Sequence, residues 1–263
     1  MNMKSAFKNL ISKEILHLRW VIVAGLLLNA ALSALLVITY RYMGKIVGEL
    51  PPEMLEMLSK YRLARELTAL FSNYPYYVWS QWNAKNLTQL LAVISIVISS
   101  IQFASENSKK TIGFYLTRPI RRAEGFTAKL SAGAAIIFAI FGGGAAVMWL
   151  ASRIAGYDAD WGRFFAASFI SIVWGLVFYS ATSIISVLFS DPIPAAAVSG
   201  ACALLLFAPG MFEKTRSLSV FYHMSAVEYY VLGKPPFLST LAAVALCSVL
   251  FAAGLKIFEK KDF

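Results

Sequence analysis

Charged residues are scarce in this chain. Lys, Arg, Asp and Glu make up only 14% of its 263 residues, whereas a soluble domain carries about a quarter. Hydrophobic residues account for 59%, and the mean hydropathy is +0.65. A water-soluble chain of this length would need a polar face on each surface helix, and whole stretches here lack one. The composition therefore excludes a soluble domain and predicts a membrane protein.

The sequence also lacks the motifs of common catalytic sites. Its two Gly-Lys pairs, at 44–45 and 233–234, have neither the earlier glycine nor the following Ser or Thr of an ATP-binding Walker A loop. Neither histidine stands in an HExxH motif, and no G-x-S-x-G elbow occurs. Cys202 and Cys247 lie in apolar runs without a CxxC partner. We therefore expect no enzyme activity, no catalytic residue, no metal site and no cofactor in this chain.

Six apolar stretches are present and long enough to cross a bilayer. Backbone amides have no water partner in hydrocarbon, so each crossing needs a helix of about 20 apolar residues. The second and fifth stretches are the shortest. The sequence predicts an all-α integral membrane protein with one transmembrane domain over residues 1–263. The predicted spans are Trp20–Tyr40, Leu87–Phe103, Leu130–Leu150, Phe164–Phe189, Ile193–Pro209 and Leu238–Leu255.

The short basic blocks lie on one side of these predicted spans, whereas the six basic residues of the long 41–86 loop are offset by four glutamates. The blocks occupy the N-terminus, the 104–125 loop and the C-terminal tail, whereas the two arginines of the 151–163 loop are balanced by two aspartates. Cytoplasmic loops carry an excess of Lys and Arg, so both termini are predicted to be cytoplasmic. Short basic blocks also explain the net charge of +10 without nucleic acid, which would require a basic stripe on one face.

Two segments on the predicted cytoplasmic side have the pattern of short helices. Residues 1–19 alternate apolar positions with Lys8, Lys13 and Glu14, which predicts an amphipathic interface helix in the headgroup layer. A basic leader that only fixes topology would have the same pattern. In 104–125, Tyr115 and Leu116 share one side of a short helix that Pro119 ends. Such a helix, held outside the bilayer by two spans, suits a soluble partner, and a solvated basic loop explains the residues almost as well.

The 104–129 segment resembles the permeases of type 2 ATP-binding-cassette (ABC-2 type) exporters. That family carries a Glu-rich stretch, a basic or Gly position followed by Thr, then Leu-x-x-Pro-Ile-x-Arg and a Lys that opens the third span. The tail Phe258–Phe263 is similar to the family's closing Phe-basic-basic-Asp motif. Lys110 stands where many members have Gly. The matching positions are Glu106, Lys110-Thr111-Ile112, Leu116, Pro119-Ile120, Arg122 and Ala128-Lys129.

The resemblance implies an exporter permease whose ATPase is a separate cytoplasmic subunit carrying ATP and Mg. It also implies a second permease chain, the same or different, in the lipid of the cell (plasma) membrane. The segment between the second and third spans would be the coupling helix that docks on the ATPase. Its implied contact residues are Glu106, Lys109, Lys110, Thr111, Tyr115, Leu116, Pro119, Arg121 and Arg122.

The external side holds two longer loops, 41–86 and 210–236. The first is predicted to contain an amphipathic helix over 53–71, followed by an aromatic run. An aromatic belt at the membrane interface explains that run, and a lid or docking surface is the alternative. The resemblance implies short re-entrant helices in the second loop. The aromatic run consists of Tyr74, Tyr76, Tyr77, Trp79 and Trp82.

A few polar residues lie within the predicted spans. They either line a translocation path or hydrogen-bond between packed helices. No charged residue lies deep in a predicted span, which disfavours an ion-coupled secondary transporter. A membrane scaffold or assembly factor that transports nothing is the other alternative. The polar candidates are Asn29, Ser95, Ser99, Thr182 and Ser186.

Overall fold

The structure is a computed structural model that describes residues 3–51, 53, 54, 60, 61, 68, 70–108 and 121–261. The described part of the chain is helical and contains no strand. Six helical segments are long and apolar enough to cross a membrane, and each overlaps one predicted span. The prediction of an all-α protein with six spans is confirmed. The six segments are Arg19–Gly48, Tyr74–Ser108, Arg122–Ile154, Trp161–Leu188, Pro192–Met211 and Phe237–Lys260.

The first half of the bundle contains a short helix and three long ones. The second span is a composite, because two π-helical stretches, η1 and η2, interrupt its α-helical hydrogen bonding. The elements are α1 (Met3–His17), α2 (Arg19–Gly48), α5 (Tyr74–Val78), η1 (Trp79–Leu87), α6 (Thr88–Ser99), η2 (Ser100–Ala104), α7 (Ser105–Ser108) and α9 (Arg122–Ile154).

The second half holds the most buried helix and several short ones. The 210–236 region consists mainly of single helical turns. Its elements are α10 (Trp161–Leu188), α11 (Pro192–Phe207), η3 (Ala208–Met211), η4 (Arg216–Leu218), α12 (Val220–Met224), α13 (Val227–Tyr230) and α14 (Phe237–Lys260). The predicted helix over 53–71 lies largely outside the described residues and stays a prediction.

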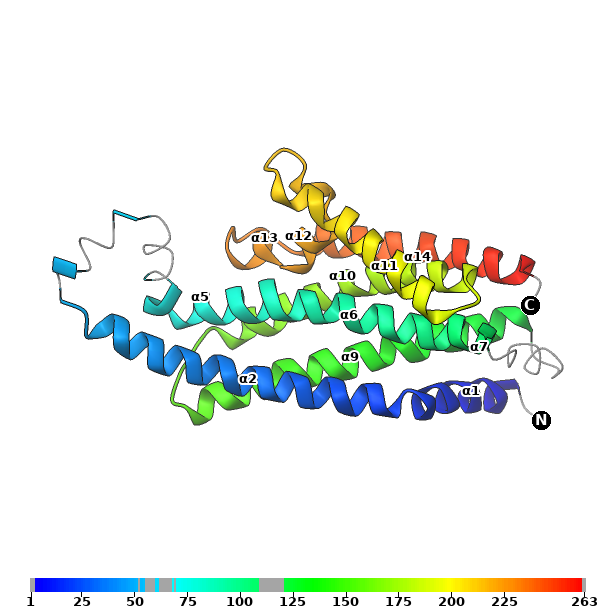
Figure 1. The fold of residues 1–263 in the computed structure, drawn as a ribbon, viewed down its shortest axis with the longest axis horizontal. Coiled ribbons are helices and arrows are strands. Elements are labelled where there is room, and N and C mark those ends of the chain that lie inside the picture. The colour runs from blue at the N-terminus through cyan, green and yellow to red at the C-terminus, as the bar shows by residue number, and fades with distance from the viewer. Residues whose placement is uncertain are drawn as a thin grey trace.

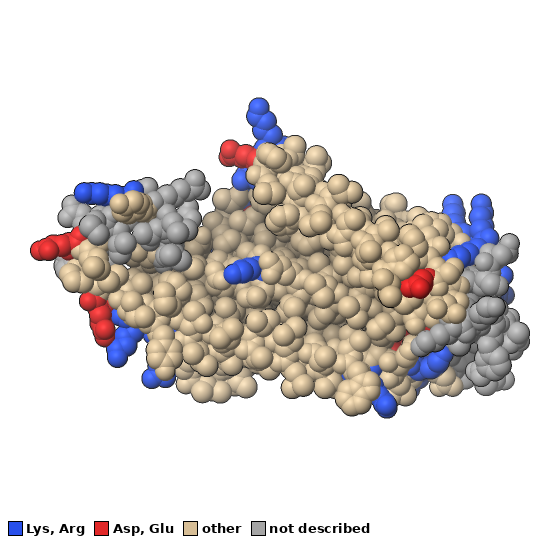
Figure 2. All heavy atoms as spheres, in the orientation of Figure 1, with Lys and Arg blue, Asp and Glu red and all other residues tan. Residues whose placement is uncertain are grey.

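The long helices run along one axis of an elongated bundle (Figure 1). Both chain ends lie at one end of it, here called the termini end, together with α1 and α7. The turn between α9 and α10 and the start of the second span lie at the opposite end. Figure 2 shows charged side chains mainly at these ends and on the projecting 210–216 region, with a broad uncharged surface between.

α10 is the central helix. It contacts α6, α9, α11, α12 and α14, and 72% of its most apolar stretch is buried. The corresponding share is 28% for α2, 11% for the fifth span and 17% for α14. These three helices therefore expose most of their apolar side chains outside the single chain, as helices facing lipid or another chain do.

The aromatic run that opens the second span is not an exposed belt. Tyr77 and Trp82 are 2% and 0% exposed, and the ring of Tyr74 lies 4.7 Å from that of Tyr40. The two tyrosine hydroxyl groups are satisfied inside the bundle, since Tyr77 donates to the Leu36 carbonyl oxygen at 3.0 Å and Tyr74 to the Ser152 hydroxyl at 2.5 Å. The belt prediction is wrong for these residues because the helix begins at Tyr74, not Leu87, and carries the run into the core.

A stretch of small residues lets α2 and α9 approach closely. A Cβ atom added at Gly144 would lie 2.5 Å from Oδ1 of the buried Asn29, so no larger residue fits without a shift. The neighbouring Gly142 is exposed, and an added Cβ there would meet nothing within 4 Å. Small residues commonly allow such contacts between membrane helices.

The two glycines provide a matched test of this packing. We expect Gly144→Ala to lower the free energy of unfolding by about 1–3 kcal/mol, because the new methyl group displaces Asn29. Gly142→Ala should leave it unchanged or raise it, since alanine favours the helix by about 1 kcal/mol. Unfolding in mixed micelles with increasing denaturing detergent measures both. Equal effects of the two variants would show that the close approach of α2 and α9 is unimportant.

Candidate functional site

Three ionisable side chains from distant parts of the sequence meet at the termini end. Lys129 of α9 lies 3.0 Å from Glu14 of α1 and 2.8 Å from Glu106 of α7, measured between ammonium nitrogen and carboxylate oxygen. All three residues are at most 5% exposed. We call this group the Lys129 cluster. It ties the interface helix, the end of the second span and the start of the third span together.

Local sequence explains how Glu14 enters the bundle. Leu10 and Glu14 lie one turn apart on α1, and Leu18 follows directly after the helix ends at His17. All three are buried, so the carboxylate belongs to the apolar stripe that packs against the rest of the chain. Transfer of a charge from water to such a site costs several kcal/mol unless an opposite charge meets it. Lys129 supplies that charge, and the ring of Phe103 lies 6.0 Å from its ammonium group.

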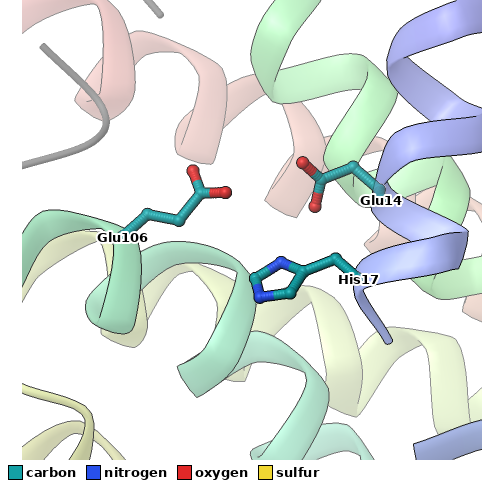
Figure 3. Close-up of side chains that lie close together, drawn as sticks. All are labelled: Glu14, His17 and Glu106. Carbon is teal, nitrogen blue, oxygen red and sulfur yellow. The ribbon is translucent and has the colours of Figure 1, made fainter. Parts of the chain in front are cut away.

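His17 brings a third potential ligand beside the two carboxylates. Figure 3 shows Glu14 and His17 on α1 and Glu106 facing them from α7. One ligand atom from each lies within 4.8 Å of the others, a grouping that could hold a metal ion. However, the ammonium group of Lys129 already contacts both carboxylates, and a cation would have to displace it. We therefore assign the carboxylates to the ion pairs and no metal to this site.

A polar connection leads from the cluster toward the middle of the bundle. The Gln102 side-chain amide donates to the Lys129 carbonyl oxygen at 2.9 Å. The Tyr179 hydroxyl of α10 donates to the Gln102 side-chain oxygen at 2.6 Å. Gln102 and Tyr179 are 0% and 1% exposed. The second, third and fourth spans are thus hydrogen-bonded to each other next to the cluster.

The C-terminal tail is held at the same end. Arg122, the first residue of α9, donates from Nη1 to the carbonyl oxygens of Glu259 at 2.8 Å and Lys261 at 2.9 Å. Phe258 is 4% exposed and packs on Phe103 and Phe126. The Lys261 side chain donates to the carbonyl oxygen at the end of α10, and burial lowers the pKa of its ammonium group. Much of the tail that resembles the family's closing motif is therefore part of the bundle.

The predicted ATPase-contact residues fall into three groups. Lys109, Lys110, Thr111, Tyr115, Leu116 and Pro119 lie outside the described residues, so their role stays a prediction. Arg121 is exposed just before α9, where a partner can reach it. Glu106 does not fit a surface contact, because its carboxylate is buried against Lys129, and Arg122 holds the tail.

The polar residues predicted for a path or for helix packing are all inside the chain. Asn29, Ser95, Ser99, Thr182 and Ser186 are each 0% exposed. The Asn29 amide donates to the Gly25 carbonyl oxygen at 2.7 Å, and the Thr182 hydroxyl to that of Tyr179 at 3.0 Å. Full burial favours packing over a path, but these hydrogen bonds run within one helix and not between helices, and the hydroxyl groups of Ser95 and Ser186 have no partner among the described residues.

Sequence reasoning missed Glu14 and Lys129 as a pair. One signal was present, namely a glutamate in the apolar stripe between Leu10 and Leu18, since a stripe of that kind normally excludes charge. No comparable signal identifies Lys129 as its partner, because the two residues are 115 positions apart.

Removal of one member of the cluster should destabilise the protein. Lys129→Met leaves two buried carboxylates without their counter-ion, and we expect the free energy of unfolding to fall by about 3–5 kcal/mol. The triple variant Glu14→Gln, Lys129→Met, Glu106→Gln removes every charge and should recover most of that loss. Lys256→Met, an exposed lysine of α14 near the same end, is the control and should change little. The prediction fails if the single and triple variants are equally unstable.

Comparison with known proteins identifies the family of this chain. The chain matches the family described as ABC-2 family transporter protein over residues 7–263. No curated protein matches it. The family match covers both the Lys129 cluster and the tail contacts as well as all six spans, and the chain belongs to the ABC-2 family of transporters.

Proposed function

We propose that this chain is the transmembrane permease subunit of an ATP-binding-cassette exporter in the cell membrane. A separate ATPase subunit binds ATP and Mg and docks on the termini end, which is then cytoplasmic. Membership of the ABC-2 family and six spans support this assignment. The observation that carries it is the way in which both ends of the 109–120 segment are fastened to the bundle.

The residues before this segment bind three other elements. Glu106 joins α1 and α9 through Lys129. The Asn107 amide donates to the Phe189 carbonyl oxygen at 3.1 Å, just beyond the end of α10. A displacement of the segment would therefore act on α1, α9 and α10 together, because buried ion pairs and hydrogen bonds resist separation.

The residues after the segment bind the last span. Arg122 connects the start of α9 to the end of α14 through two hydrogen bonds. The residues on both sides of the 109–120 segment are thus fixed to α1, α9, α10 and α14, so a force that a docked ATPase applied to the segment would be passed to these helices.

ATP would act by selecting one arrangement of the permease. The nucleotide binds more tightly to the closed ATPase pair than to the open pair, and that difference is the free energy available to shift the spans. Two permease chains, identical or different, would pair around the path. The exposed apolar faces of α2, α11 and α14 would be shared between this partner and lipid.

Replacement of residues 109–116 by a Gly/Ser linker tests the assignment. With a tagged candidate ATPase subunit co-expressed, we expect the variant to lose at least tenfold in co-purified permease, since the predicted contact residues are gone. The same linker in place of residues 53–60, in the loop assigned to the outside, is the control and should co-purify normally. Unimpaired co-purification of the 109–116 variant, together with no nucleotide-dependent change in the permease, would favour a scaffold that transports nothing.

A further inference from the structure

A groove of about 700 Å³ lies between the second span, the fifth span and the α12 region, which contributes Ser219, Phe221, Tyr222 and Ser225. Lys85, Thr88 and Gln89 of the second span form one wall, and Leu204, Phe207 and Met211 form the other. The first wall carries a cation and an amide, and the second is apolar.

The groove lies beside the helical part of the second span. The helix begins at Tyr74, so Lys85 is inside it and not before it, as the predicted start at Leu87 implied. The Asn83 amide, two residues earlier, donates to the Ser168 hydroxyl of α10. Ser168 lies seven residues after the start of α10 at Trp161, so Asn83 contacts α10 about 10 Å from the N-terminal end of that helix. Lys85 therefore lies inside the helical segment Tyr74–Ser108, 11 residues from its start, although it precedes the predicted span that begins at Leu87.

Two polar side chains face the groove without a protein partner. Lys85 and Gln89 are one turn apart and exposed, and neither side chain forms a hydrogen bond or an ion pair within the described part of the chain. In plain hydrocarbon, unsatisfied polar groups of this kind cost several kcal/mol each. Lys85 alone could extend its ammonium group to the membrane surface. The Gln89 side chain is shorter and lies one turn further along the helix, so it cannot reach that surface in the same way.

The backbone at this point is also unusual. Lys85 belongs to η1, a nine-residue π-helical stretch. Such stretches are rare and frequently occur at functional sites, since they interrupt the regular hydrogen bonding of the helix. Across the groove, Leu204 and Met211 are 71% and 72% exposed, and they present a large apolar surface to whatever the cation binds.

We propose that this groove binds an amphiphile with an anionic head and a single apolar body. The ammonium group of Lys85 and the amide of Gln89 hold the head, and Leu204, Phe207 and Met211 cover the body. A volume of about 700 Å³ suits a ligand of drug size, which favours a single-chain amphiphile over a phospholipid with two chains. On the proposed function, this amphiphile represents the class of substrate that the permease moves.

Binding can be measured on the purified permease chain without its ATPase. The probe is 11-(dansylamino)undecanoic acid, titrated by dansyl fluorescence against the protein in phosphatidylcholine nanodiscs. We expect Lys85→Gln to weaken binding about tenfold or more, because a charge-assisted hydrogen bond is lost, and Lys85→Arg to retain it. Lys45→Gln, an exposed lysine of α2, is the control and should bind as the parent does. The methyl ester of the probe should bind the parent as weakly as the acid binds Lys85→Gln.

Two results would overturn the proposal. One is equal binding of the acid and the ester, or of the parent and Lys85→Gln. The other is loss of the Lys85-dependent binding in nanodiscs that contain phosphatidylglycerol, which would assign the groove to a bilayer phospholipid. Since no ATPase is present, failure here is distinct from failure of the ATPase to co-purify. Binding without co-purification would leave an amphiphile site on a chain that is not a permease subunit.

Discussion

The contact of Lys129 with two carboxylates constrains the whole termini end. An ammonium group this deeply buried is tolerated only where opposite charge meets it, so α9 can adopt its position only when Glu14 of α1 and Glu106 of α7 are also in place. The hydrogen bonds from Gln102 and Tyr179 extend the same constraint to α10. The interface helix, often a peripheral element in membrane proteins, is here bound to the core by charge.

The opposite end is held by a different interaction. There the rings of Tyr40, Tyr74, Tyr77 and Tyr157 pack against one another. The hydroxyl groups of Tyr74 and Tyr77 donate to the Ser152 hydroxyl and the Leu36 carbonyl oxygen. Aromatic rings can slide with little loss of contact area, whereas an ion pair in a low dielectric is steeply sensitive to separation. The bundle is therefore held by charge at one end and by ring packing at the other.

The six spans were predictable because backbone amides have no water partner in lipid, so each apolar stretch there has to be a helix. The helix ends were not predictable in this way. The second span begins at Tyr74 and not at the predicted Leu87, because the aromatic and polar residues of 74–86 look like a loop in the sequence but form a helix that packs inside the bundle. Glu14 illustrates the same limit of sequence-based prediction for the Lys129 cluster. Its place in an apolar stripe was visible in the sequence, but its partner Lys129 is brought to it only by the packing of α1 on α9.

The two sites proposed for this chain lie on one continuous helix. Lys85 and Glu106 are 21 residues apart in the second span, or about 32 Å, and each is in or next to a π-helical stretch, η1 and η2. A rigid α-helix would pass any rotation at Glu106 unchanged to Lys85. A helix with π-helical stretches can instead change its local register, because its hydrogen bonding is already irregular there. A pull on the 109–120 segment would then reach the wall of the groove along the second span, as well as through the contact of Asn107 with the end of α10. The second span is therefore the element through which docking of an ATPase and binding of an anionic amphiphile would be linked.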